Sequence, residues 1–232
     1  MSSVATEDGN RILFALIRAI QANKQYLSDI DGLIGDGDHG VNMNKGFTLC
    51  EKALNETPGD LSHGLKTLAQ ILITQIGGSM GPLYGMFFRG MAQASKDLET
   101  LDAAGFAKML VAAKEKILTV SDAQQGDKTL LDTLLPAEEA FRTALDAGES
   151  FAQCLTKMSE AAETGRDSTK DMIAKVGRSS RLGERSRGVL DAGAQSVAVI
   201  TDFMTAPQPE ERVRQWLQGM AGAAGGGRSD GH

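Results

Sequence analysis

The sequence predicts an all-α protein, a single-domain antiparallel bundle or barrel of eight helices. Aromatic residues make up only 5% of the 232-residue chain, and alternating runs of Val, Ile and Thr, which favour strands, are nearly absent. Ala, Leu, Met, Gln, Lys and Glu dominate instead, and these residues favour helix. Apolar residues also recur at helical spacing in successive blocks that are joined by short connections.

The blocks of helical periodicity define the expected elements. They predict helices over residues 7–27, 40–56, 60–76, 84–97, 103–119, 129–146, 149–175 and 192–205. Composition is uniform up to residue 206, so we expect one domain over residues 1–206. We expect residues 207–232 to form a tail, with one short helix near 209–220 and a flexible Gly-rich end.

Charge and hydropathy exclude several classes of protein. The net charge of −6 argues against nucleic acid as a partner, because phosphate backbones need a basic face. No stretch of about 18 uncharged apolar residues occurs, so we expect no membrane span. Residues 1–8 lack the basic start and apolar core of a signal peptide. Cys50 and Cys154 are expected to be buried thiols in a reduced compartment, which predicts a cytoplasmic protein.

Residues 29–43 form the first of four unusual segments between the predicted helices. Four aspartates lie within ten residues there, with no Lys or Arg between them. Such close like charges repel one another unless they are solvated or share a cation. Carboxylate oxygens without thiols suit Mg²⁺ or Ca²⁺, but the spacing of a calcium-binding EF-hand is missing. Mg²⁺ needs only a few carboxylates because phosphate and water complete its octahedron. A solvated acidic turn is the alternative.

The same segment contains the pattern G-x-G-x-x-G at residues 35–40, which is typical of dinucleotide-binding folds. That interpretation needs a preceding strand, and none is predicted. The aspartates inside the pattern would also face the phosphates directly unless metal ions lie between them. We therefore interpret the segment as carboxylates that hold Mg²⁺, which in turn holds phosphate. The backbone amides of residues 40–42, at a predicted helix N-terminus, are suited to a phosphate oxygen.

Three further segments share this polar, glycine-rich character. Residues 77–85 are suited to a backbone nest that binds an anion, with a tight turn as the alternative. No Walker A pattern occurs, which excludes a P-loop enzyme. Residues 126–132 either cap the next helix or place Lys128 or Thr129 near a site. Residues 177–188 hold four arginines, which suit phosphate binding, with a solvated basic loop as the alternative. Together the four segments supply metal-binding carboxylates, backbone nests for anions and phosphate-binding arginines. Phosphoryl transfer depends on such groups, because positioning and charge neutralisation do most of its catalysis.

On these segments the chain resembles the nucleotide-binding L subunit of bacterial dihydroxyacetone kinase, a family that also forms the C-terminal domain of single-chain dihydroxyacetone kinases. The resemblance covers roughly residues 10–205. The motifs that carry it are Gly35-Asp36-Gly37-Asp38-His39-Gly40 with Asn42-Met43, Gly77-Gly78-x-x-Gly81-Pro82-Leu83-Tyr84-Gly85, Gly126-Asp127-Lys128-Thr129, and Gly177-Arg178-x-Ser180-x-Leu182-Gly183-Glu184-Arg185-Ser186 with Asp191-x-Gly193-Ala194.

The resemblance implies an eight-helix barrel that holds ADP or ATP at one end through two Mg²⁺ ions. The family's metal ligands fall on Asp31, Asp36 and Asp38, which leaves Asp29 outside the set. Arg178 is expected to act in catalysis by offsetting charge on the phosphoryl group. Nucleotide contacts are expected at His39, Gly40, Val41, Asn42, Gly78, Ser79, Met80, Gly81, Ser121, Thr129, Leu130, Arg178, Asp191, Ala192 and Gly193.

The chain departs from the family's common pattern at five of these positions. They are Ser79, Met80, Ser121, Leu130 and Ala192. None of these departures removes an expected metal ligand, but all five bear on how the nucleotide is exchanged.

The function implied is that of an ADP/ATP- and Mg²⁺-binding subunit of a kinase for dihydroxyacetone or a related short ketose, such as erythrulose. The substrate is expected on a separate K subunit, bound to a histidine that this chain lacks, so the chain alone should phosphorylate the sugar negligibly. Two mechanisms stay open. Either ATP binds and leaves each turnover, or ADP stays bound and is rephosphorylated by a phosphohistidine protein of the phosphoenolpyruvate-dependent phosphotransferase system.

A different class of function is the alternative. The chain would then be a nucleotide-occupied regulatory module that acts by docking a transcription factor or another partner. Whether the chain forms a homodimer is also left open by the sequence.

Overall fold

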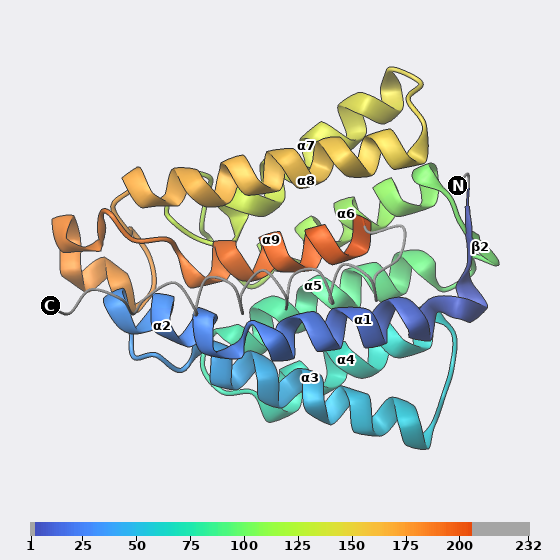
Figure 1. Cartoon of the computed structure of the whole chain (residues 1–232), viewed down its shortest axis with the longest axis horizontal. Coiled ribbons are helices and arrows are strands. Elements are labelled where there is room, and N and C mark those ends of the chain that lie inside the picture. Colours follow the sequence, from blue (N-terminus) through green and yellow to red (C-terminus); the bar gives the residue numbers. More distant parts are fainter. Residues whose placement is uncertain (1–2, 206–232) are drawn as a thin grey trace, which may run out of the picture.

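The computed structural model of the protein describes residues 3–205. The α-helices of this part are α1 (Gly9–Ala22), α2 (Lys24–Ile34), α3 (His39–Glu56), α4 (Leu61–Gln75), α5 (Met80–Ser95), α6 (Ala103–Leu118), α7 (Leu131–Asp146), α8 (Phe151–Ser168) and α9 (Ala192–Thr205), shown in Figure 1. Three short 3-10 helices are η1 (Thr6–Asp8), η2 (Thr169–Asp171) and η3 (Arg178–Ser186). The prediction of an all-α fold is confirmed. A short antiparallel pair of β1 (Val4–Ala5) and β2 (Thr100–Leu101) was not predicted.

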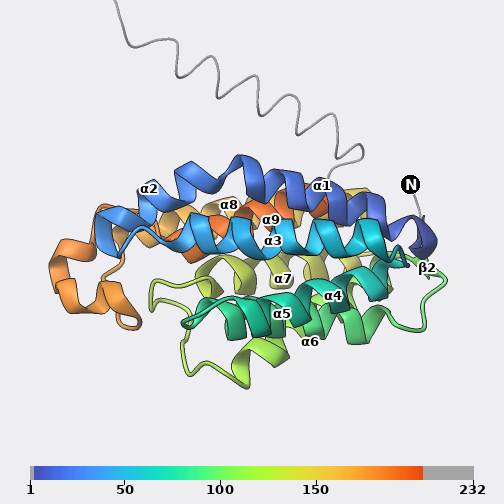
Figure 2. The same cartoon turned by 90° about the horizontal axis from the view of Figure 1, so that it is seen from below.

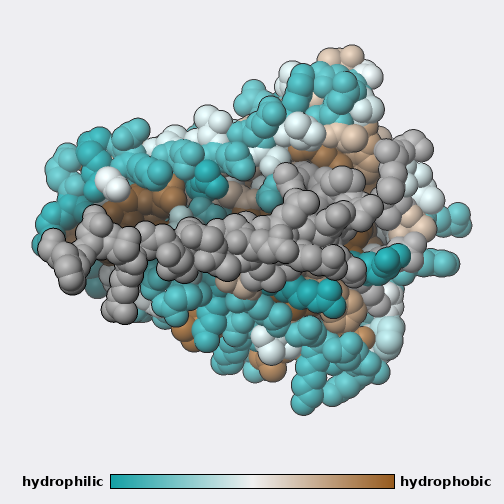
Figure 3. Space-filling view, in the orientation of Figure 1, coloured by the Kyte–Doolittle hydropathy of each residue, from teal (hydrophilic) through white to brown (hydrophobic). Residues whose placement is uncertain are grey.

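The helices close into a ring. The helices α3 to α8 each pack against the helix before and the helix after them in the chain, and α9 packs against both α8 and α1. Because α2 follows α1 along the same side of the molecule (Figure 1), the two fill one position, and the ring has the eight positions that the sequence predicts. Figure 3 shows hydrophilic residues around the outside of the coloured surface and hydrophobic patches nearer its middle. Outward-facing polar residues are expected of amphipathic helices around a shared core.

The first predicted helix, 7–27, is wrong in its extent. The structure has two helices there, because the chain turns at the buried Asn23, whose side-chain amide donates a hydrogen bond to the Ala19 carbonyl at 2.9 Å. The second of them, α2, continues to Ile34 because Leu27, Ile30 and Ile34 extend an apolar face that is buried. The acidic segment 29–43 is therefore not one loop. It is the end of α2, a connector over residues 35–38, and the start of α3.

Two other boundaries also differ from the prediction. The helix expected to start at residue 84 begins at Met80, and Pro82 fits in its first turn, where a missing amide hydrogen removes no helical bond. The helix expected to extend to residue 175 ends at Ser168 and is followed by η2. Both differences lie next to the connectors that the sequence singled out.

The barrel gathers the unusual segments at one end. The connectors α2–α3, α4–α5 and α6–α7 and the helix η3 lie at the same end, at the left in Figures 1 and 2, and β1 and β2 lie at the opposite end. Between the ends, the core contains two groups of touching aromatic rings: Phe47, Phe87 and Phe88, and Phe106, Phe141 and Phe151. The two cysteines are free and buried in this core, as expected.

The predicted tail, 207–232, and its helix near 209–220 lie outside the described residues, so the proposed division at residue 206 stays a prediction. None of the helices within residues 3–205 combines the length and the apolarity that crossing a membrane would need.

Close contact between α5 and α6 gives a first test of the fold. A Cβ added at Gly90 would lie 2.3 Å from the Ala112 carbonyl oxygen of α6, so the backbone of one of the two helices would have to shift to admit it. We expect Gly90→Ala to lower the free energy of unfolding by about 1–3 kcal/mol, measured by urea denaturation.

Gly32→Ala is the matched control for this substitution. Gly32 is also inside a helix, but its added Cβ would meet only ordinary contacts. Here alanine should be neutral or stabilising by up to about 1 kcal/mol, because glycine loses more backbone entropy on folding. Equal effects of the two substitutions would contradict the packing of α5 on α6.

Candidate functional site

A pocket of about 440 Å³ opens at the connector end of the barrel. Its walls come from the end of α2, the connector 35–38, the start of α5, the end of α6, and the segments 121–131, 176–179 and 191–193. All four segments that the sequence singled out thus contribute to one concave site.

Most of the site residues expected from the sequence line this pocket. They are Asp31, Asp36, Asp38, His39, Ser79, Met80, Ser121, Thr129, Leu130, Arg178, Asp191, Ala192 and Gly193. The expected residues that do not line it are Gly40, Val41, Asn42, Gly78 and Gly81. Two of these pack against backbone instead, because a Cβ at Gly40 would meet the Lys24 carbonyl at 1.9 Å and one at Gly81 the Ile76 carbonyl at 2.3 Å. Their roles toward a ligand stay predictions.

The sequence did not identify the apolar part of the pocket. Ile34, Leu83, Ile117, Val120 and Val176 line it. Four of them continue the apolar periodicity of a helix or follow its last turn, so the sequence indicates for them only a role in packing. The signal that could have identified them as pocket residues is their position, since each lies within a few residues of a polar connector at this end of the barrel.

Three carboxylates converge at the edge of the pocket. Asp31 lies near the end of α2, Asp36 and Asp38 lie in the connector, and one oxygen of each lies within 4.8 Å of the others. Gly35 is needed there because a Cβ would stand 2.5 Å from Asp31 Oδ1, and Gly37 takes a left-handed φ of 76°. Burial and the neighbouring carboxylates raise the pKa of Asp38.

This donor set fits Mg²⁺. It contains only carboxylate oxygens, and the mutual repulsion that raises the pKa of Asp38 is relieved when a cation is shared. Asp29 is not part of the cluster, because its Oδ1 accepts a hydrogen bond from Gln25 Nε2 at 2.7 Å on the exposed side of α2. The assignment of the other three aspartates as metal ligands stays a prediction.

Arg178 brings positive charge to the same edge. It is the first residue of η3, follows Gly177 with its left-handed φ of 72°, and forms an ion pair with Asp36. Its side chain is 67% exposed, so the nitrogens of the guanidinium that do not pair with Asp36 can contact a ligand at the mouth of the pocket. The structure thus places one of the four arginines of this segment beside the carboxylates.

A neutral polar group forms part of the pocket floor. His39 Nε2 lies 2.7 Å from Ser196 Oγ, and its ring meets Tyr84 edge to face. The Tyr84 hydroxyl donates to the Gly193 carbonyl at 3.2 Å, which connects α5 to the start of α9. Burial lowers the pKa of His39 to about 4, so the imidazole is uncharged at neutral pH and provides no positive charge for phosphate.

The segment 126–129 is folded by a residue that the sequence did not single out. The carboxylate of the buried Asp132 accepts hydrogen bonds from the backbone amides of Gly126, at 2.5 Å, and Thr129, at 2.7 Å. The expectation that Asp127 or Thr129 caps this helix is wrong. The N-cap of α7 is Leu130, which makes no side-chain cap hydrogen bond, and Asp127 accepts from the Gln124 amide and pairs with Lys175. A carboxylate in the first turn of α7 was the available signal.

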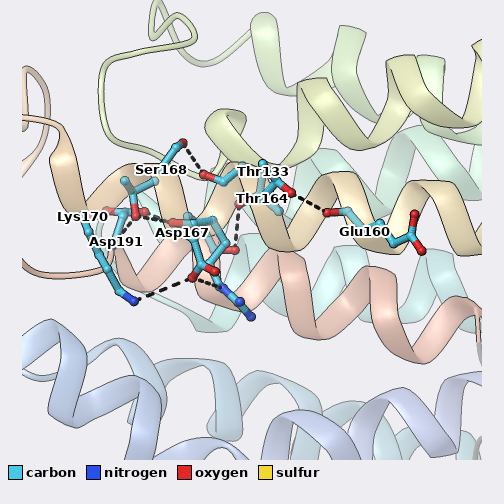
Figure 4. A network of polar contacts seen from close by, with 11 residues as sticks. Thr133, Glu160, Thr164, Asp167, Ser168, Lys170 and Asp191 are labelled. Carbon is cyan, nitrogen blue, oxygen red and sulfur yellow. Dashed lines mark hydrogen bonds and ion pairs between the residues drawn. The ribbon is translucent and has the colours of Figure 1, made fainter.

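Asp191 joins the opposite wall to the end of α8. Its Oδ2 accepts a hydrogen bond from the Ala194 amide at 2.8 Å, and its own amide donates to Thr169 Oγ1 at 3.0 Å. Figure 4 shows Asp191 beside the polar residues at the end of α8, below α7. Burial raises the pKa of the Asp191 carboxyl to about 6.

Fold and site together define a helical barrel whose end pocket combines clustered carboxylates, an arginine and polar backbone turns. The chain matches the DAK2 domain over residues 33–206, and it belongs to this family.

Two relatives are similar over most of their length. The chain is 41% identical over 186 residues to "PEP-dependent dihydroxyacetone kinase 1, ADP-binding subunit DhaL" of Listeria innocua, which covers 80% of this chain and 88% of that one. It is 36% identical over 181 residues to the ADP-binding subunit DhaL of the PEP-dependent dihydroxyacetone kinase of Escherichia coli, covering 78% and 86%.

A solved structure shows the same fold. The dihydroxyacetone kinase of C. freundii, in complex with AMP-PNP and Mg²⁺, superposes with a TM-score of 0.63 at 20% identity. The match covers 88% of this chain and 34% of that chain.

The raised pKa of Asp191 predicts a pH-dependent contribution to stability. The folded carboxyl has a pKa of about 6 against 3.8 for the ordinary group, so the folded protein binds more protons between these pH values. The contribution of wild-type Asp191 to stability therefore falls as the pH rises from about 4 to 6.

We expect Asp191→Asn to gain stability relative to the wild type over that range, by less than the about 3 kcal/mol that the full pKa difference represents. The gain stays below this value because Asp191 lines the pocket and is partly accessible to water, which screens its charge. Urea denaturation of both proteins in EDTA at several pH values measures this difference. The other titrating groups are the same in both proteins, so their effects on stability cancel in the comparison. A difference that does not change with pH would contradict the burial of this carboxylate.

Proposed function

We propose that this chain is the ADP- or ATP-binding and Mg²⁺-binding subunit of a cytoplasmic kinase that phosphorylates dihydroxyacetone or a related short ketose on a separate K subunit. The observation that carries this proposal is the convergence of three aspartates and Arg178 at one pocket in a member of the DAK2 family. The relatives named above are ADP-binding subunits of dihydroxyacetone kinases.

The residues divide by chemistry. Asp31, Asp36 and Asp38 would hold two Mg²⁺ ions, which neutralise phosphate charge when they are bound. Arg178 would act as the catalytic cation beside them, since guanidinium suits phosphoryl oxygens. The remaining expected contact residues of the pocket would position the nucleotide, and the apolar side chains between them suit a base.

Two features support a ketose on another subunit. His39, the histidine in the lining of the pocket, is buried and its Nε2 is occupied by Ser196 Oγ, so this nitrogen is not available to bond a ketose covalently. Large hydrophobic side chains are also exposed near the pocket, which suits coverage by a partner surface. Within residues 3–205, those at or within two residues of the pocket lining are Leu33, Val41, Leu118, Val120 and Val176.

The two cysteines bear on the proposed compartment. Free thiols at Cys50 and Cys154 fit a reducing compartment such as the cytoplasm.

Loss of a metal ligand tests the proposed site. We expect Asp36→Asn and Asp38→Asn each to weaken ADP binding in the presence of Mg²⁺ by roughly tenfold or more, since even partners of metal ligands have effects of that size. Calorimetric titration of ADP into EDTA-treated protein, with and without Mg²⁺, measures this. Asp29→Asn is the matched control and should leave the affinity unchanged, because Asp29 lies outside the cluster. Equal affinities in all four proteins would refute the site.

We further propose that ADP stays bound and is rephosphorylated by a phosphohistidine protein of the phosphoenolpyruvate-dependent phosphotransferase system. Both relatives named above are subunits of PEP-dependent kinases, which supports this route over exchange of ATP.

A bound cofactor should survive purification. We expect about one ADP per chain to be released when protein purified with Mg²⁺ is denatured, as measured by chromatography. With the K subunit, ketose phosphorylation should require phosphoenolpyruvate and the phosphohistidine protein, and the chain alone should be inactive. Turnover with ATP and the K subunit, without the phosphohistidine protein, would favour exchange of nucleotide instead. Binding of a transcription factor without any turnover would favour the regulatory alternative.

A further inference from the structure

Lys128 is exceptional in two ways. It is only 1% exposed, although lysine is almost never fully buried, and within residues 3–205 it is the only residue other than glycine with a positive φ, at 63°. A lysine keeps a left-handed backbone conformation only where its surroundings impose it. The sequence left open whether this residue belongs to a helix cap or to the site.

The ammonium group of Lys128 is fully occupied by backbone. Its Nζ donates hydrogen bonds to the carbonyls of Val189 at 2.5 Å and Thr169 at 2.6 Å, with a longer one to Met172 at 3.4 Å. An ammonium group has three hydrogens, so none is left for a ligand. Lys128 therefore does not act as a phosphate-binding lysine, although it is itself one of the residues that line the pocket.

The acceptors of these hydrogen bonds connect directly to the far wall of the pocket. Thr169 is fully buried. Its hydroxyl accepts a hydrogen bond from the Asp191 amide and donates one to the Arg166 carbonyl. Val189 lies two residues before Asp191, and the amide of Gly188 donates to the Lys170 carbonyl at 2.7 Å. The segment 188–191 is thus held against η2 (Figure 4), with Lys128 bonded to both.

The backbone of Lys128 belongs to the near wall. Lys128 lines the pocket together with Thr129 and Leu130, and Asp132 fixes the turn before them. One side chain therefore joins the wall at 129–130 to the wall at 191–193.

We propose that Lys128 is a positioning residue, whose ammonium group sets the spacing between these two walls, and thereby the affinity for the nucleotide, by holding backbone carbonyls rather than the ligand. This inference rests on the proposed function for its ligand, but the connection between the walls can be tested without any ligand. Lys128→Met removes the ammonium group and keeps an unbranched apolar side chain. Lys175→Met is the matched control, because this nearby lysine is largely exposed and pairs only with Asp127.

The first measurement is amide hydrogen exchange of the nucleotide-free protein. We expect Lys128→Met to raise exchange at least tenfold in residues 187–191, while α5 is unchanged and Lys175→Met behaves as the wild type. Unchanged protection of residues 187–191 overturns the proposal. If Lys128→Met fails to fold, Lys128→Gln decides by the same criterion, because it also removes the ammonium group but leaves a polar donor beside these carbonyls.

The second measurement is nucleotide affinity. We expect Lys128→Met to raise the Kd for Mg-ADP at least tenfold, while phosphorylation at saturating nucleotide with the K subunit stays within about threefold of the wild type. Gly90→Ala, which destabilises the distant contact of α5 with α6, should leave the Kd unchanged. A Kd within twofold of the wild type in Lys128→Met makes the lysine purely structural and overturns the proposal.

Failure of the proposed function would look different. Wild-type protein that binds no nucleotide contradicts the proposed function and the nucleotide role of Lys128 together. The exchange experiment then still decides whether Lys128 joins the two walls.

Discussion

The convergence of three carboxylates is the constraint on which the connector end of the barrel depends. Asp31, Asp36 and Asp38 repel one another within 4.8 Å, so the chain around them has to be rigid. The end of α2 fixes the first, and the α2–α3 connector, with glycines on both sides of Asp36, presents the others. A closed ring of helices provides this rigidity, because it anchors both ends of every connector.

The floor and walls of the pocket add almost no free positive charge. His39 is neutral, and the ammonium group of Lys128 is used up by backbone carbonyls. The cation that faces the pocket beside the carboxylates is Arg178, and it is paired with Asp36. Polar groups in this part of the barrel therefore serve mainly to hold the walls, and charge is concentrated at the mouth.

The sequence predicts the fold and the four segments of the site because both depend on local patterns. Apolar periodicity gives eight ring positions, and glycines with aspartates or arginines mark the connectors. The break at Asn23 escapes this reasoning because the apolar pattern continues through it to Ile34. The role of Lys128 escapes it because three carbonyls from residues more than 40 positions away decide where its ammonium group lies.

Charge balance at the mouth also explains why metal and nucleotide should bind together. One guanidinium cannot neutralise three carboxylates, and a nucleoside diphosphate brings further negative charge to the same edge. Without divalent cations the phosphates would face the carboxylates at close range, where repulsion is strong because the site is partly shielded from water. If the proposed function holds, nucleotide release would then be coupled to metal release. This coupling would favour a nucleotide that stays in place and is rephosphorylated there, because leaving would expose the repulsion among the carboxylates again.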